Sequence, residues 1–370
     1  MNILTPVLEL IGSLGLLLYG MKLMSDGVQK SAGEKLQRTL SVVTSNKVVA
    51  ILTGMLITMI IQSSGATTVM VVTFVNAGLI SLAQSAGVIF GANIGTTITA
   101  WIVSIFGFNF KISAFAVPVV GLGYFLSIFK KRKYQNIGEA IMGFGLLFLG
   151  LSGLSSVFTP DQLGWMLNIK GTGASAIILG FLIGIVVTAL LHSSSAFSAI
   201  VITMAYNGLI SWELAAAMTL GSNVGSTVDS IMASMGTSAN GRRAALIHVM
   251  FNLFGTIVVL CFLKPFLDLV MFITPGQENS NIAIRISMLH TVFNIITTVV
   301  MTPLSGKLVK IAEFLIKDDP SEKKKVFKLE FIEHSGKENV ATYIIQKEKA
   351  IADMTDVVTD MFDKIQIGVT

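Results

Sequence analysis

The sequence predicts an all-α integral membrane protein built from two inverted-topology repeats. Three observations lead to this prediction: the composition, a repeat of constant offset, and an uneven distribution of basic residues. The chain has 370 residues, of which 53% are hydrophobic and only 13% are charged, whereas soluble domains carry about 25% charged residues. Its mean hydropathy is +0.77. These values favour a chain whose main partner is a lipid bilayer.

The composition also excludes several function classes. The formal net charge is +5, but the basic residues lie between apolar segments, which indicates a membrane fringe rather than nucleic-acid binding. The single Cys261 excludes an intrachain disulfide, and no G-x-S-x-G elbow with His and Asp partners supports a serine hydrolase. No Lys or Arg precedes the apolar segment Ile3–Met24, which we therefore interpret as a permanent span. We expect no enzyme and no cofactor.

Four motifs recur 130 residues later without gaps. The pairs are GLLLYG and GLLFLG at 15–20 and 145–150, QSSGA and HSSSA at 62–66 and 192–196, NAGLIS and YNGLIS at 76–81 and 206–211, and GANIGTT and GSNVGST at 91–97 and 221–227. Self-similarity at a fixed offset predicts two copies of one structural unit. We expect the first copy within 1–134, the second within 135–305 with an extra span at 284–303, and a cytoplasmic helical tail at 306–370.

A spanning helix needs about 20 apolar residues. Suitable segments are 3–24, 82–104, 112–129, 137–157, 212–235, 244–263 and 284–303. Two further apolar segments, 48–80 and 178–210, carry polar clusters at their centres. As one straight helix, either would reach about 50 Å, which is too long for a hydrocarbon core of about 30 Å. We therefore predict two re-entrant helical hairpins, whose tips are surrounded by protein or water.

With hairpins that do not cross the membrane, the first half crosses three times and the second half begins on the opposite side. This is the arrangement of inverted repeats. One predicted side then carries thirteen basic residues, and the other carries only Lys111, Lys170, Lys264 and Arg285. The positive-inside rule makes the thirteen-charge side cytoplasmic, so we expect the N-terminus outside and the C-terminus inside a cell membrane. The thirteen are Lys30, Lys35, Arg38, Lys47, the KKRK run at 130–133, Arg242, Arg243, Lys307, Lys310 and Lys317.

Two tips that enter from opposite faces would meet near the membrane midplane. A helix that begins at a tip directs free N–H groups and the positive end of its dipole at an anion. Hydroxyl and carbonyl oxygens of the same segment can ligate a hard cation. The tips therefore predict a combined site for an anion and Na⁺. The first tip supplies Gln62, Ser63, Ser64 and Gly65, and the second supplies His192, Ser193, Ser194 and Ser195.

The GANIGTT and GSNVGST motifs predict breaks in two spans, because paired glycines weaken a helix. Oxygens beside such breaks are typical of membrane cation sites. Asp229, which corresponds to Thr99 in the first copy, is a functional candidate unless it reaches water at the cytoplasmic end. The alternative for the Ser and Thr clusters is hydrogen bonding between helices. We expect His248 and His290 to be packing residues bonded to a neighbouring helix.

The paired Q-S-S-type tips, each followed by a G-x-N-x-G-[ST] segment, resemble the type II sodium–phosphate cotransporter family in its bacterial branch, over about 1–305. The resemblance implies sodium-coupled import of inorganic phosphate by alternating access. Together with the tip chemistry, it predicts phosphate contacts from Gln62, Ser63, Ser64, Gly65, Asn93, Ser193, Ser194, Ser195 and Asn223. It predicts sodium ligands among Gln62, Ser64, Thr68, Asn93, Thr96, Thr97, His192, Ser193, Ser222, Asn223, Ser226, Thr227 and Asp229.

The chain departs from the family pattern at two places. Gly65 replaces a third serine, and His192 stands where the family usually has Gln. His192 predicts that uptake responds to pH between about 5.5 and 7.5, where histidine titrates. Neither hairpin contains Lys or Arg, so we expect phosphate to bind weakly without sodium. The alternatives are a transporter of another small anion, such as a dicarboxylate or sulfate, and a membrane sensor or scaffold that transports nothing.

The C-terminal tail changes character after residue 317 and becomes rich in Lys, Glu and Asp. Apolar residues recur in it at helical spacing, which predicts a partner helix or a homo-oligomer. They are Ile344, Ile351, Met354, Val358, Met361 and Ile365. The resemblance implies that this tail begins a PhoU-like helical domain.

Overall fold

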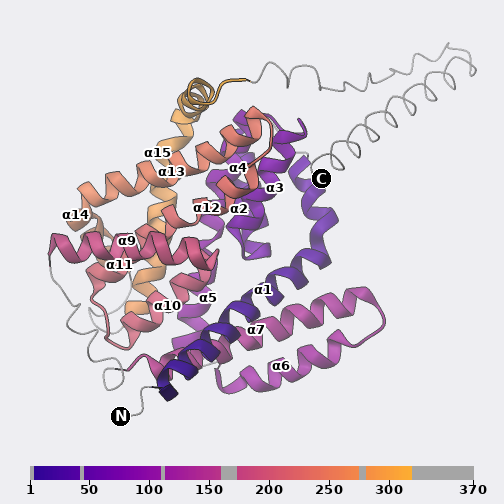
Figure 1. Ribbon diagram of the computed structural model, residues 1–370, viewed down its shortest axis with the longest axis vertical. Helices are drawn as coiled ribbons and strands as arrows, with labels where there is room; N and C mark the ends of the chain where they lie inside the picture. Colours follow the sequence, from indigo (N-terminus) through magenta and orange to yellow (C-terminus); the bar gives the residue numbers. More distant parts are fainter. Residues whose placement is uncertain (1–3, 42–45, 110–112, 160–172, 275–280, 319–370) are drawn as a thin grey trace, which may run out of the picture. The chain divides into compact units, whose positions relative to one another are not determined.

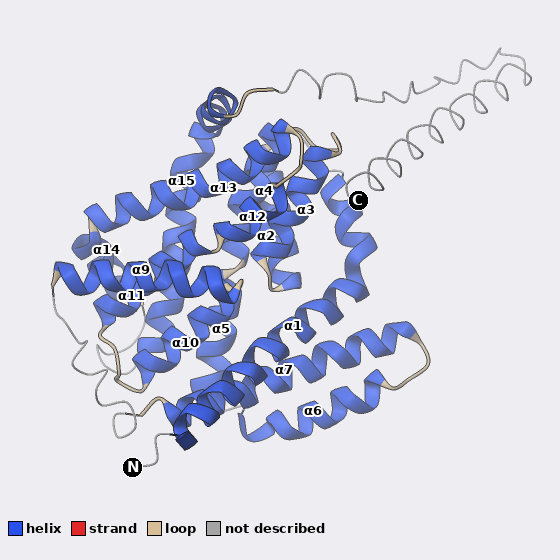
Figure 2. Cartoon of the chain, viewed as in Figure 1, coloured by secondary structure: helices blue, strands red, loops and turns tan. Residues whose placement is uncertain are grey.

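The computed structural model describes residues 4–41, 46–109, 113–159, 173–274 and 281–318, and every regular element in these ranges is a helix (Figures 1 and 2). These residues belong to one compact unit, Met1–Asp318, and Asp319–Thr370 forms a second unit. The apolar seam predicted at 344–365 lies outside the described residues.

Six helical stretches in the described part of the chain are long and apolar enough to cross a membrane. The prediction of an all-α membrane protein is therefore confirmed for this part. The stretches are Thr5–Ala32, Leu82–Phe108, Arg132–Val157, Ala174–Leu191, Ala239–Cys261 and Ile282–Leu315. The first stretch lies in α1 (Leu4–Ser41). The second contains α4 (Leu82–Gly95), α5 (Thr97–Ile102) and most of the π-helix η1 (Val103–Asn109). The other four stretches are the helices α7, α9, α13 and α15, in this order and with the bounds just given.

Two segments differ from the expected spans. The segment predicted at 112–129 forms α6 (Ser113–Ser127), which has only 15 residues. Helix α9, which we expected to be half of a hairpin, is an apolar helix of 18 residues and is by itself a candidate span. The segment predicted at 212–235 is divided into α11 (Trp212–Gly225) and α12 (Thr227–Ser234), at the break that the GSNVGST motif predicts. A short helix that we did not predict, α14 (Leu263–Ile273), follows α13.

Each of the segments 48–80 and 178–210 contains two helices with a short turn between them. The first contains α2 (Lys47–Ile61) and α3 (Ser64–Asn76), and the second contains α9 and α10 (Ser194–Tyr206). The break is local in origin: Gln62 and His192 adopt left-handed φ values of 61° and 50°, which no helix continues. Ser63 and Ser193 then cap the next helix by accepting a 3.1 Å hydrogen bond from Ala66 N or Ala196 N. That the tips re-enter the membrane stays a prediction.

The glycines of the GANIGTT and GSNVGST motifs bring helix backbones together rather than unwinding a helix. A Cβ on Gly91 would collide with the carbonyl oxygen of Ile51, and one on Gly221 with that of Phe181. Gly91 thus holds α4 against α2, and Gly221 holds α11 against α9. The interruptions at Thr96 and Ser226 each last one residue, with helical φ values of −63° and −64°. Both motifs therefore interrupt their spans, as predicted, but each break is only one residue long.

Helices α1, α6 and α7 lie together on one side of the described unit (Figure 1). Helices α1 and α7 touch along their length through glycines. A Cβ on Gly20 would meet the backbone of Leu147, and a Cβ on Gly27 would meet that of Ala140. This contact fixes the face that α1 presents to the two tips.

Candidate functional site

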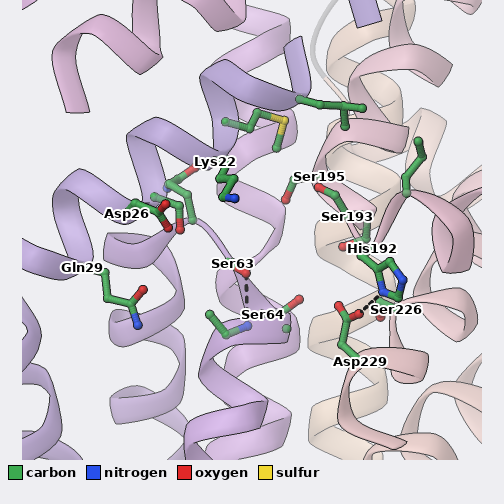
Figure 3. Close-up of a pocket in the computed structure, with 18 residues that line it drawn as sticks. Lys22, Asp26, Gln29, Ser63, Ser64, His192, Ser193, Ser195, Ser226 and Asp229 are labelled. Atoms are coloured by element: carbon green, nitrogen blue, oxygen red, sulfur yellow. Dashed lines mark hydrogen bonds and ion pairs between the residues drawn. The ribbon is translucent and has the colours of Figure 1, made fainter. Parts of the chain in front are cut away.

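One cavity of about 400 Å³ brings both predicted tips together (Figure 3). Its walls come from the turn between α2 and α3, the turn between α9 and α10, helix α12, and one face of α1. The predicted site residues that line it are Gln62, Ser63, Ser64, Gly65, His192, Ser193, Ser194, Ser195, Ser226 and Asp229. The two serine-rich motifs, 130 residues apart in the sequence, therefore face the same space.

The chemistry of the tips follows from how their helices begin. The first N–H groups of α3 and α10 have no partner within their own helix, and the positive ends of both helix dipoles point toward the turn. Ser64 and Ser194 lie in these first turns, are almost fully buried, and still line the cavity. The cavity thus receives hydrogen-bond donors from two helix starts, an arrangement that suits an oxyanion.

Thr99 joins the two tips on one side. Its hydroxyl donates to Gln62 Oε1 over 2.9 Å and accepts from Ser195 Oγ over 3.3 Å. Gln62 belongs to the first tip and Ser195 to the second, and the residues involved carry no charge. Because Thr99 is 1% exposed, these two hydrogen bonds are shielded from water and hold the tips at a fixed spacing.

Asp229, which corresponds to Thr99 in the repeat, joins the tips on the other side. Its Oδ1 lies 2.7 Å from Nδ1 of His192. Its Oδ2 lies against Gly65, where an added Cβ would be only 2.6 Å away. The departures at Gly65 and His192 therefore have one common cause. The carboxylate occupies the space that a serine side chain at 65 would need, and the imidazole is its hydrogen-bond partner.

The other predicted sodium ligands lie behind the cavity wall. Thr68 and Asn93 each donate to a backbone carbonyl within their own helix. Thr97 and Thr227 each donate to a carbonyl of the preceding helix, three residues earlier in the chain, and Ser222 Oγ accepts from Thr188 over 2.9 Å. Of these bonds, the one between Thr188 and Ser222 matches the alternative in which hydroxyls hold helices together, and the others are local side-chain-to-backbone bonds. Thr96 Oγ1 is buried without a hydrogen-bond partner among the described residues.

The two buried histidines each bond to a neighbouring helix, as expected. The ring of His248 on α13 lies 3.0 Å from Ser230 Oγ on α12. The ring of His290 on α15 lies 2.8 Å from Asn223 Oδ1 on α11. The second contact occupies the Asn223 oxygen, which we had assigned to both phosphate and sodium. Neither histidine lines the cavity.

Our sequence analysis missed the wall that α1 contributes. Lys22, Ser25, Asp26 and Gln29 line the cavity from this helix, and Figure 3 shows Lys22 reaching toward the space between Ser63 and Ser195. Their spacing of three or four residues places them on one helical face. This polar stripe within an apolar span was a usable signal, but α1 carried no tip motif and we did not examine its faces.

Comparison with known proteins identifies the family. The sequence matches the Na+/Pi-cotransporter family over residues 16–156 and 166–302. It is 29% identical over 320 residues to the uncharacterized protein YqeW of Bacillus subtilis, an alignment that covers 84% of this chain and 99% of that protein. It is 28% identical over 315 residues to the "Putative inorganic phosphate export protein YjbB" of Escherichia coli, covering 85% of this chain and 56% of YjbB.

A third similar protein comes from a mammal. Sodium-dependent phosphate transport protein 2B of Rattus norvegicus is 33% identical over 131 residues, which is 34% of this chain and 18% of that protein. No solved structure matches the sequence. The family match spans both repeats and all the residues that line the cavity. The chain therefore belongs to the Na+/Pi-cotransporter family.

Proposed function

We propose that the protein transports inorganic phosphate across a membrane together with Na⁺, and that both are bound in the cavity between the two tips. The observation that carries this proposal is that the serine-rich starts of α3 and α10 line one cavity. Phosphate would accept hydrogen bonds from the serine hydroxyls and the first N–H groups of the two helices. Transport would follow alternating access around this fixed site.

Sodium is a second substrate of the same cavity. The Asp229 carboxylate and the Ser226 hydroxyl supply oxygen atoms at the cavity wall, and Gln62 Oε1 is another oxygen close by. A cation near these oxygens would attract phosphate and would itself be attracted by it, so each ligand would raise the affinity for the other. This mutual effect is the physical basis that we propose for coupling.

The topology that we propose is the inverted repeat. Support comes from the backbone: the left-handed turns at Gln62 and His192, and the positive φ values of 70° at Gly78 and 73° at Gly208, recur with the offset of 130. We propose that 48–80 and 178–210 re-enter the membrane from opposite faces, with the N-terminus outside and the C-terminus cytoplasmic. Labelling of single cysteines at Lys131 and Lys264 from each side tests this, because the two positions then lie on opposite faces.

Import is the direction that we propose, because an inward sodium gradient would drive both ligands inward. Export is the second candidate, since the relative YjbB is named as an export protein. The two are separated by imposing the sodium gradient in either direction across vesicles with oriented protein. Phosphate that follows sodium supports coupling. Phosphate that leaves the cytoplasmic side whatever the gradient supports export.

Uptake of radiolabelled phosphate by proteoliposomes tests the function itself. We expect uptake with an inward Na⁺ gradient, and little uptake when choline replaces Na⁺. Excess unlabelled sulfate and succinate should compete weakly. Strong competition by either would favour the alternative of another small anion. No flux of any of the three would favour a membrane sensor or scaffold, whose helical partner or second copy would bind through the tail at 306–370.

A further inference from the structure

We propose that Lys22 on α1 is a phosphate-binding residue, supplying the fixed positive charge that the two tips lack. The inference rests on the proposed function and adds a residue from outside both repeat motifs. It would add a fixed charge to the positive charge that we expect sodium to bring to the tips.

The position of Lys22 is the first argument. It lines the cavity together with Ser63, Ser64 and Ser195, and its side chain extends from α1 toward the space between the tips (Figure 3). A lysine ammonium group offers three hydrogen-bond donors at the end of a long, flexible stem. Such a group suits an anion in the cavity that the helix starts also face.

The charge balance of the cavity is the second argument. The ionisable residues on its wall are Lys22, Asp26, His192 and Asp229. His192 is already hydrogen-bonded to Asp229. Lys22 makes no hydrogen bond or ion pair with any other described residue. Its ammonium group is thus the cavity's one uncommitted cationic group within the described part of the chain, while the two carboxylates attract cations.

The rigidity of α1 at this point is the third argument. Gly20 and Gly27, on either side of Lys22, are the places where a Cβ would collide with the backbone of α7. Lys22 itself is exposed, so its side chain is not needed for the packing of α1 on α7. A residue held on a rigid helix, and free of a structural role, is well placed to bind a ligand.

The repeat supplies the fourth argument. Residue 22 corresponds to Ser152 in the second copy, and residue 26 corresponds to Ser156. Neither serine lines the cavity. The charges at residues 22 and 26 are therefore present in the first copy alone, and the packing of the repeated unit does not require them.

Binding of radiolabelled inorganic phosphate to the purified full-length chain tests the inference, in Na⁺ and in N-methyl-D-glucamine. The variants are Lys22→Met, Lys22→Arg and the control Lys30→Met. Lys30 lies on the same helix and bonds to Glu139 over 2.8 Å, but it does not line the cavity. We expect Lys22→Met to weaken binding about tenfold or more in both salts, because a charge-assisted hydrogen bond is lost. Lys22→Arg should stay within about threefold of the wild type, since it keeps the charge, and Lys30→Met should change nothing.

The outcomes separate this inference from the proposed function. If Lys22→Met binds phosphate as the wild type does, Lys22 is not a ligand, and the proposed function stands. If the wild type binds sulfate instead of phosphate, and Lys22→Met weakens that binding, the proposed substrate is wrong and the anion role of Lys22 holds. If the wild type binds neither anion in either salt, both proposals fail. Equal melting temperatures of the three variants and the wild type establish that any loss comes from the site rather than from the fold.

Discussion

The tips of the two halves share one backbone conformation, but the residue that joins the tips is neutral in the first half and ionisable in the second. In the first half, Thr99 bonds to Gln62 and accepts from Ser195. In the second half, Asp229 bonds to His192 and lies against Gly65. Each residue contacts the tip of its own copy and the third residue of the other tip's serine motif. The tips are thus joined by a neutral residue on one side and by a charged residue on the other, and our proposal of sodium binding applies to the side of Asp229.

Removing the charge of Asp229 should break this asymmetry and have the largest effect. We expect Asp229→Asn to weaken the apparent affinity for Na⁺ about ten- to a hundredfold, because the Coulomb attraction between the carboxylate and the cation is lost. Sodium titration of phosphate uptake measures this. Thr99→Val is the matched variant of the first half and should change the apparent Na⁺ affinity by less than about threefold. Equal effects of the two variants would contradict the assignment of cation binding to one side.

Packing, in contrast, should be the same in both halves. Gly91→Ala and Gly221→Ala each place a Cβ against a backbone carbonyl of the neighbouring helix, and overpacking of this kind costs about 1–3 kcal/mol. We expect both variants to lower the melting temperature of the purified protein by similar amounts. Gly12→Ala is the control, because a Cβ there meets no atom within 4 Å. A melting temperature lowered by only one of the two variants would show that the halves pack differently.

Filling the space beside Gly65 tests whether Asp229 explains why this chain has Gly65 and His192 instead of the residues usual in the family. Gly65→Ser brings a Cβ to 2.6 Å from Asp229 Oδ2, so the carboxylate must rotate away and its contact with His192 weakens. We expect phosphate uptake to fall about threefold to tenfold. Adding Asp229→Thr and His192→Gln restores the pattern of the first half and should relieve the crowding. If Gly65→Ser is equally harmful in that background, the carboxylate is not the cause.

The smallest effect should come from the helix caps. Ser63 and Ser193 accept hydrogen bonds of the same 3.1 Å length from the third residue beyond them. Replacing either serine with alanine should cost about 1 kcal/mol of stability. Thermal unfolding of the two single variants checks this. We expect melting temperatures that agree with each other, whereas a large difference would mean that one cap has a further structural role.

The sequence allowed the class, the repeat and the tips to be predicted, because these depend on composition and on local backbone chemistry. The turn at Gln62 ends α2 through a single left-handed residue, and Ser63 caps the next helix. These are short-range effects that a motif records. The same holds for the copy at His192 and Ser193, which is why the repeat pointed to the two segments that line one cavity.

Features that depend on neighbours in space were not predictable in this way. Gly91 suggested a weak helix, but a glycine is needed there because the carbonyl of Ile51 on another helix leaves no room for a Cβ. Asn223 suggested a ligand, but its oxygen bonds to His290, 67 residues away in the sequence. Lys22 was missed because its repeat counterpart is a serine, so no repeated motif marks this face of α1.

The central claim is that both halves form one shared phosphate site. Equilibrium binding of phosphate to the wild type, Ser64→Ala and Ser194→Ala in saturating Na⁺ tests it most directly, since these serines are repeat counterparts on the two tips. The account predicts one phosphate per chain, and it predicts that either substitution weakens that single site. Two phosphates per chain, or a variant that loses one site and keeps another at full affinity, would contradict it.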